Sequence, residues 1–79
     1  MKEFLLYLLS QMVDYPKEIE IRENIPSESS YIFSISANKK DIGKIIGKNG
    51  KIIQALRNVV KIIAIKQGKH VRIEIAEQV

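Results

Sequence analysis

The sequence contains no cysteine, which excludes disulfide bonds, thiolate metal ligands and thiol nucleophiles. It has a single histidine and scattered acidic residues, so neither a metal-binding cluster nor an acid–base pair suited to catalysis can be recognised. The apolar run at residues 4–9 is far shorter than the roughly 20 residues that a membrane span requires. We therefore expect a cytoplasmic protein that is not an enzyme, has no catalytic or metal-binding residues and needs no cofactor.

Charge is unevenly distributed along the chain. The 79 residues carry a net charge of +4, to which residues 1–36 contribute −3 and residues 37–79 contribute +7. A chain of this length is expected to form a single domain over residues 1–79, with a thin core. The basic half suits a polyanion such as a nucleic acid, although ordinary solubility charge explains it equally well.

Alternation of apolar and polar residues predicts three β-strands. They cover residues 18–23, 31–36 and 70–75, and a loop over residues 24–30 separates the first two. The first two strands should pair as a hairpin, because they are adjacent in the chain and joined by turn-forming residues. The aromatic residues of the second strand are expected to lie in the core.

Apolar residues at helical spacing predict three helices, over residues 2–13, 39–46 and about 51–67. Asn38 suits the N-cap of the second helix, and Asp41 is interpreted as an acidic residue at its positive end. The last helix and the first have more apolar residues than one buried stripe requires, which suggests an exposed patch and a dimer. In the last helix these apolar residues are Ile52, Ile53, Leu56, Val59, Val60, Ile62, Ile63 and Ile65.

Two glycines three positions apart join the second and third predicted helices. Gly47 and Gly50 permit backbone angles that other residues avoid, and they let a ligand approach the main chain. The following helix offers free N–H groups and a positive dipole end at this loop, so the site suits a phosphodiester backbone. The residues expected to bind it are Gly47, Lys48, Asn49 and Gly50 in the loop, Lys44 and Lys51 beside it, and Ile42, Ile46 and Ile53 as an apolar floor for the bases.

Other phosphate-binding loops fit this segment poorly. A nucleotide-binding P-loop that began at Gly43 would need a glycine where Lys48 stands, and a dinucleotide fingerprint would need one at Ile45. A glycine pair alone is also compatible with a plain turn between helices. The element order and the flanking lysines and isoleucines favour the binding loop.

Residues 46–53, Ile-Gly-Lys-Asn-Gly-Lys-Ile-Ile, resemble the signature of K-homology (KH) domains, whose glycine loop clamps about four nucleotides. The α-β-β-α-α-β order, an α+β arrangement with three helices on one face of a three-stranded sheet, is that of the type II KH fold. The chain is similar over nearly its whole length to the stand-alone bacterial KH proteins of the KhpA family, notably at residues 41–50. The resemblance implies single-stranded RNA binding and a role as an RNA chaperone or post-transcriptional regulator. It also implies a homodimer, or a heterodimer with a larger KH-containing protein of the Jag/KhpB type.

Two other functions remain open. Helices joined by a glycine turn also occur in helix-turn-helix proteins that bind duplex DNA, although the helix after this turn carries isoleucines rather than base-reading polar groups. A protein-interaction module without nucleic-acid binding is the second alternative, and the lysines of the loop argue against it. Arg57 and Lys61 either extend the basic surface or, more simply, solvate the outer face of their helix, and His70 is interpreted as a solvated residue at a strand end.

Overall fold

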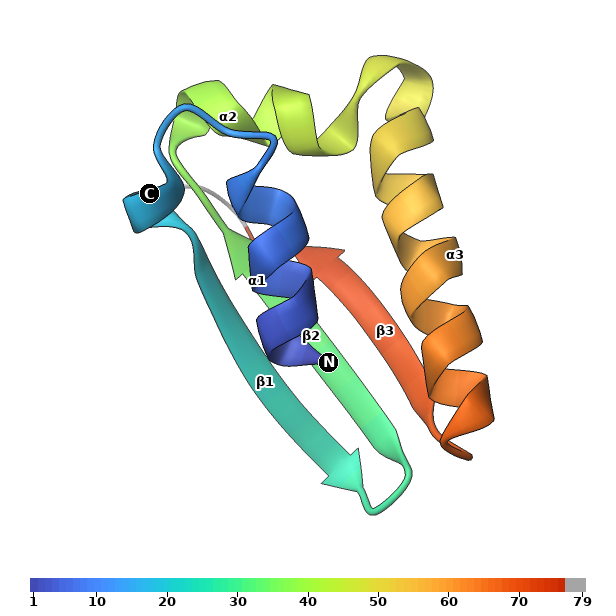
Figure 1. The fold of residues 1–79 in the computed structure, drawn as a ribbon. Helices are drawn as coiled ribbons and strands as arrows, with labels where there is room; N and C mark the ends of the chain where they lie inside the picture. The colour runs from blue at the N-terminus through green and yellow to red at the C-terminus, as the bar shows by residue number, and fades with distance from the viewer. Residues whose placement is uncertain (77–79) are drawn as a thin grey trace.

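Three helices and a three-stranded mixed sheet make up the computed structural model, which describes residues 1–76 (Figure 1). The observed order is α-β-β-α-α-β, which confirms the predicted fold class. Within residues 1–76, no helix is long and apolar enough to cross a membrane. The elements are α1 (Lys2–Ser10), β1 (Glu20–Ser27), β2 (Ser30–Ser36), α2 (Lys39–Ile46), α3 (Lys51–Lys66) and β3 (His70–Ile75), with short 3₁₀ turns at Pro16–Glu18 and Lys48–Gly50.

The central strand of the sheet is β2, which pairs antiparallel with β1 and parallel with β3. Helices α1 and α3 lie in front of the sheet in Figure 1, and α2 runs across one end of it. The side chains of Phe33 and Ile35 on β2 are fully buried, as the alternating pattern predicts, whereas Ser34 between them is partly exposed. No strand of the described chain pairs with the outer edge of β3, so the backbone groups of that edge face α3 or solvent.

Strand β1 is longer than predicted. Its pairing with β2 continues to Ser27, across an irregularity that begins at Asn24, so the expected loop over residues 24–30 is wrong. Pro26 is tolerated because β1 is an edge strand, where a missing N–H group costs no ladder hydrogen bond. The residues that form the turn between β1 and β2 are 28–29 only.

The first helix is shorter than predicted but buries the expected stripe. It ends at Ser10 rather than near residue 13. Leu5 and Leu9 are fully buried, and Leu8 and Met12 pack against the core while remaining partly exposed. This stripe fixes α1 against the sheet at its i, i+4 positions.

The third helix buries one stripe of its side chains and leaves several of its apolar residues exposed. Its buried side chains recur at the i, i+3, i+7 spacing of one helical face. A single stripe of this kind is sufficient to pack the helix on the sheet. Ile52 and Val59 are 38% and 42% exposed, so they belong to the surplus of apolar residues for which an exposed patch was expected. The residues that α3 buries are Ile53, Leu56, Val60 and Ala64.

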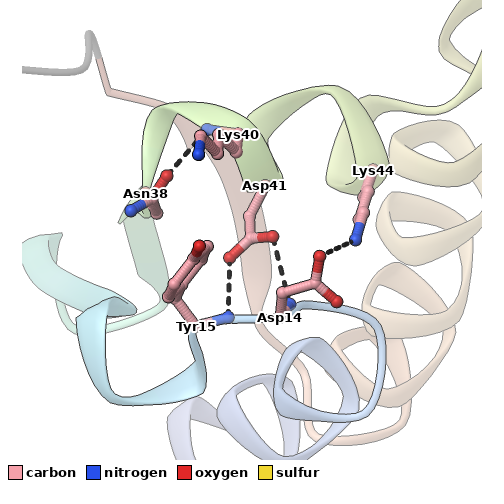
Figure 2. A network of polar contacts seen from close by, with 6 residues as sticks. All are labelled: Asp14, Tyr15, Asn38, Lys40, Asp41 and Lys44. Atoms are coloured by element: carbon pink, nitrogen blue, oxygen red, sulfur yellow. Dashed lines mark hydrogen bonds and ion pairs between the residues drawn. The ribbon is translucent and has the colours of Figure 1, made fainter.

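A buried carboxylate fastens α2 to the linker that follows α1 (Figure 2). Asp41 is fully buried, and its two oxygens accept hydrogen bonds from the backbone N–H groups of Asp14 (3.1 Å) and Tyr15 (3.0 Å). Asp41 does lie in the first turn of α2, as predicted, but its main contacts are these two distant N–H groups. Such contacts are required, because a carboxylate can be buried only when hydrogen bonds replace its hydration.

Further polar contacts hold both ends of α2. The side chain of Asn38 accepts a hydrogen bond from the N–H of Lys40 (2.8 Å), which confirms the predicted N-cap, and its amide donates to the carboxylate of Glu18 (3.2 Å). Near the other end, the ammonium group of Lys44 forms an ion pair with Asp14. These contacts position α2, and with it the start of the loop that follows.

Replacing Asp41 with Asn should lower the free energy of unfolding by about 1.5 to 3 kcal/mol, the range for hydrogen bonds to a charged group. The amide replaces one acceptor oxygen with a donor, which would face a backbone N–H group. Urea denaturation measures the loss. The matched control is Asp14→Asn, which keeps the N–H that Asp41 binds and removes only the exposed ion pair with Lys44, so it should change stability little. Equal losses in the two variants would contradict the role assigned to Asp41.

Candidate functional site

The loop between α2 and α3 turns sharply, because residues 47, 49 and 50 all have positive φ angles. Gly47 has φ 76° and ψ 173°, a combination that is essentially restricted to glycine. Asn49 (φ 57°) and Gly50 (φ 71°) are left-handed, a conformation that asparagine adopts more readily than most residues. The predicted glycine pair and the asparagine between them therefore match what this backbone requires.

Gly47 also makes room for a neighbouring side chain. A Cβ atom at this position would lie 2.5 Å from Cγ1 of Ile52, far inside any real contact distance. At Gly50 the nearest atom would be 3.9 Å away, on Ile53, which is an ordinary contact. The close approach at Gly47 is therefore made by the protein's own Ile52, and not by space left for a ligand.

The two middle residues of the loop, between the glycines, present free backbone donors. Lys48 and Asn49 are exposed, and no hydrogen bond occupies their N–H groups in the described part of the chain. The N–H of Gly50 points inward instead and closes the turn by donating to the carbonyl oxygen of Gly47 (3.1 Å). Adjacent free N–H groups beside an ammonium group form a site for an anion.

The lysines around the loop differ in how free their charges are. The hydrogen bond from Lys44 to the Asp14 carboxylate raises the pKa of Lys44 and compensates much of its charge. Lys51 is exposed in the first turn of α3, a turn without any acidic residue. A cation there lies at the positive end of the helix dipole, which is unfavourable for the helix. The start of α3 therefore concentrates positive charge beside the free N–H groups.

The three isoleucines expected to form an apolar floor are not equally accessible. Ile42 and Ile46 of α2 are partly buried and pack against the core, so part of each side chain reaches the surface. Ile53 of α3 is only 6% exposed and belongs to the core itself. The surface available to a ligand on this side comes mainly from α2.

A groove of about 840 Å³ lies between α3 and β3 and begins one turn beyond the glycine loop. One wall carries the polar side chains of α3, and the other is the free outer edge of β3. Arg57 spans the two walls, because its Nε and Nη2 atoms both donate to the carbonyl oxygen of Ile73 (3.2 and 3.1 Å). The residues that line the groove are Gln54, Arg57, Asn58, Lys61, Val71, Arg72, Ile73, Glu74 and Ile75.

Sequence reasoning missed part of this groove. Gln54 and Asn58 were not singled out, and the simpler interpretation of Arg57, as a side chain that only solvates the helix, is wrong because its guanidinium group contacts β3. The polar residues at 54, 57, 58 and 61 recur at i, i+3, i+4 and i+7 within an otherwise isoleucine-rich helix. That polar stripe was the signal that could have revealed them.

The flank of α3 that faces away from the groove is apolar. We call the set Ile52, Ala55, Val59 and Ile62 the apolar flank; all four side chains are exposed. A second hollow, of about 360 Å³, lies beside it and is bounded on the other side by Leu8 of α1 and by Met12 in the linker that follows α1. Part of the surplus of apolar residues noted in the sequence, Ile52, Val59 and Ile62, is thus exposed along one flank of α3.

An α-β-β-α-α-β domain whose second and third helices are joined by a Gly-x-x-Gly loop is a K-homology (KH) domain of type II. Comparison with known proteins agrees with this class. The family described as KhpA/KhpB, KH domain, matches residues 2–75. The chain therefore belongs to the KhpA/KhpB family of KH domains, which confirms the resemblance recognised in its sequence.

Relatives from several bacteria match nearly the whole chain, and each is named RNA-binding protein KhpA. The chain is 41% identical to the protein from Chlamydia pneumoniae over 78 residues, which is 99% of each chain. It is 40% identical to the protein from Clostridium perfringens over 75 residues, or 95% of this chain and 99% of the relative. Identity to the Listeria monocytogenes protein is 34% over 77 residues, or 98% of this chain and 100% of the relative. These names describe RNA-binding proteins and not enzymes.

Alanine substitutions should separate the roles of the glycines. Gly47→Ala should lower the free energy of unfolding by about 2 to 4 kcal/mol, since left-handed strain adds to the collision with Ile52. Gly50→Ala meets the strain alone and should cost about 1 to 2 kcal/mol. Gly43→Ala lies inside α2 with open space around the added Cβ, so it should stabilise the protein by about 0.5 to 1 kcal/mol. Urea denaturation tests the order, which a Gly47 variant as stable as the Gly50 variant would contradict.

Proposed function

We propose that this chain is a single KH domain that captures short single-stranded RNA through the loop Gly47–Gly50. The observation that carries the proposal is the pair of unoccupied N–H groups on Lys48 and Asn49, on an exposed turn beside ammonium groups. The names of the relatives support RNA as the ligand. KH modules of this kind clamp about four nucleotides with the glycine loop.

In the proposed complex, a phosphate group accepts hydrogen bonds from the N–H groups of Lys48 and Asn49. The side chains of Lys48 and Lys51 supply the nearest free positive charges, and Lys44, which is paired with Asp14, contributes less. Contacts of this type position the strand but do not read its sequence. Backbone capture therefore gives affinity for many RNA sequences and a strong dependence on salt.

The bases of the captured strand would enter the groove between α3 and β3. The groove begins one turn of α3 beyond the loop and offers the polar side chains of α3 together with the backbone edge of β3. Ile42 and Ile46, on the helix that leads into the loop, would offer apolar surface to the strand, and Ile53 contributes the small part that it exposes. A single strand suits this site because its unpaired bases can turn into a groove, whereas the bases of a duplex cannot.

The helix-turn-helix alternative is less well supported by the surface of α3. A recognition helix places an exposed polar face in the major groove of DNA. The polar residues of α3 instead line a groove shared with β3, and Arg57 is tied to that strand. The other exposed flank of the helix carries Ile52, Val59 and Ile62, which cannot read base edges through hydrogen bonds.

We propose an RNA chaperone or post-transcriptional regulator in the cytoplasm as the biological role. One loop that holds a few nucleotides gives modest affinity per copy, which suits transient contacts with many transcripts. A second copy of the domain would raise the effective affinity for one RNA by providing a second loop.

The apolar flank of α3 supports pairing with a second KH-containing chain. Ile52, Ala55, Val59 and Ile62 are spaced 3, 4 and 3 residues apart, the spacing of a coiled-coil seam, and all four are exposed. Two copies of such a helix can pack antiparallel around a two-fold axis, which buries the seam of each on the other. We propose this homodimer as the basic state, with a larger protein of the Jag/KhpB type as the alternative partner.

Reversing the charge of the loop should abolish RNA capture. The double variant Lys48→Asp with Asn49→Asp places carboxylates where the phosphate would lie, and Asp tolerates the left-handed angles of residue 49. Affinity for a short single-stranded RNA should fall at least about tenfold, and the salt dependence should flatten by about 0.7 for each phosphate that the protein no longer neutralises. Fluorescence anisotropy at several salt concentrations measures both quantities.

The matched control for this variant is Lys17→Asp with Asn24→Asp. It changes the net charge equally at two exposed positions outside α2, α3 and β3. Its affinity should fall only slightly, because only long-range attraction is weakened. If the loop variant and this control bind RNA equally well, the loop is not the site of capture.

A charged residue in the apolar flank should break the homodimer. Ile62 is 57% exposed, so Ile62→Lys should leave the fold intact and place two ammonium groups in the proposed interface. Sedimentation velocity at micromolar concentrations should find a dimer for the natural chain and a monomer for this variant. The control Ile25→Lys changes an isoleucine that is 49% exposed on β1 and should stay dimeric. A natural chain that sediments as a monomer would contradict the homodimer.

A further inference from the structure

The edge of β3 that faces the groove carries a regular series of backbone donors and acceptors. His70 donates its N–H to the carbonyl oxygen of Ser29 (2.7 Å), and Ala76 donates its N–H to that of Ile35 (2.8 Å). Even-numbered residues of this strand therefore direct their backbone groups toward β2. Because the direction alternates along a strand, residues 71, 73 and 75 direct their N–H and C=O groups outward, into the groove.

One of these outward groups, the carbonyl of Ile73, already accepts hydrogen bonds from Arg57. Its Nε and Nη2 atoms donate to the carbonyl oxygen of Ile73 over 3.2 and 3.1 Å. A carbonyl oxygen has two lone pairs, so two N–H groups on it leave no capacity for a further strong hydrogen bond. The N–H of Ile73 points the same way and has no partner in the described part of the chain. At this point of the groove, β3 can donate but cannot accept.

This contact changes which bases the edge can pair with. A bare strand residue offers a donor beside an acceptor, which complements adenine, where the N1 acceptor lies next to the N6 amino donor. With Arg57 in place, the part of the groove beside Ile73 offers the N–H of Ile73 and the remaining guanidinium N–H groups, all of which are donors. Donors alone complement two adjacent acceptors, such as O2 and N3 of cytosine or O6 and N7 of guanine. The amino group of adenine would find no free acceptor on the backbone of Ile73.

We propose that Arg57 is a specificity-determining residue, which makes the groove favour cytosine and guanine over adenine by occupying the carbonyl of Ile73. The inference rests on the proposed function, because it concerns the bases of an RNA strand held by the glycine loop. Gln54 and Asn58 lie along the same wall of the groove and carry both donors and acceptors, so they do not impose this preference. Arg57 is the residue there that contacts the edge of β3.

The test compares oligocytidine and oligoadenosine of about eight nucleotides, twice the length that one loop clamps. The natural chain should bind oligocytidine about tenfold more tightly, toward the lower end of the range for one discriminating base contact. Arg57→Met keeps an apolar stem of similar length and frees the carbonyl of Ile73. Oligoadenosine should then bind as well as oligocytidine or better, and the ratio of the two dissociation constants measured by fluorescence anisotropy should fall to about one or below.

Lys61→Met is the matched control. Lys61 lies in the same groove and carries the same charge, but it makes no hydrogen bond to β3 within residues 1–76. Its removal should weaken both oligonucleotides by one common factor and leave their ratio unchanged. If Arg57→Met does not fold, Arg57→Lys serves instead, since a single ammonium group lacks the planar fork that holds both lone pairs, and the ratio should again fall.

The outcomes distinguish this inference from the function on which it rests. A natural chain that binds neither oligonucleotide overturns both. A natural chain that binds RNA but prefers oligoadenosine overturns the specificity role alone. The same holds if the Arg57 variants weaken both oligonucleotides equally, because Arg57 would then act only as a general cation or as a tie between α3 and β3.

Discussion

The buried carboxylate of Asp41 joins the acidic first half of the chain to the basic second half. The linker after α1 has two N–H groups, on Asp14 and Tyr15, that no strand or helix satisfies, and Asp41 accepts a hydrogen bond from each. Burial of this charge is tolerable only when both bonds form, so the contact tends to be either complete or absent. Because Asp41 lies in the first turn of α2, the same contact sets the direction of that helix and the place where the glycine loop emerges.

Helix α3 has three distinct sides, each with different surroundings. One side packs on the sheet, the polar flank faces β3 across the groove, and the apolar flank lies beside α1 and solvent. On the proposed functions, RNA and a second protein chain contact different flanks of the same helix. The RNA and the second chain could therefore bind at the same time. A shift of α3 caused by either one would also move the loop at the start of that helix.

Much of the fold could be predicted from the sequence because its local signals agree. Alternation located β2 and β3, the N-cap at Asn38 located the start of α2, and the positive-φ requirement of Gly47 and Gly50 explains the loop. Local signals failed where tertiary context decides. Pro26 is an ordinary loop signal that an edge strand accommodates, so β1 extends beyond its expected end.

The site was predicted less completely than the fold. The loop residues follow from a contiguous motif, but the groove requires β3 to lie beside α3, a contact between segments that are distant in the chain. The hydrogen bonds from Arg57 to Ile73 and from the linker to Asp41 depend on the same kind of long-range placement. No local pattern indicates whether an exposed-looking arginine reaches a strand edge or an early aspartate accepts two remote N–H groups.

The packing of Ile52 against Gly47 distinguishes two reasons for keeping a residue of the glycine loop, which are the needs of folding and the needs of ligand binding. The first glycine of the loop is required by the folded chain itself, whether or not a nucleic acid ever binds. A homologue that had abandoned RNA would therefore still be expected to keep it, and its presence is poor proof of function. The informative position is the outward Lys48, whose backbone angles require no particular residue type, so that only a ligand gives evolution a reason to hold it constant.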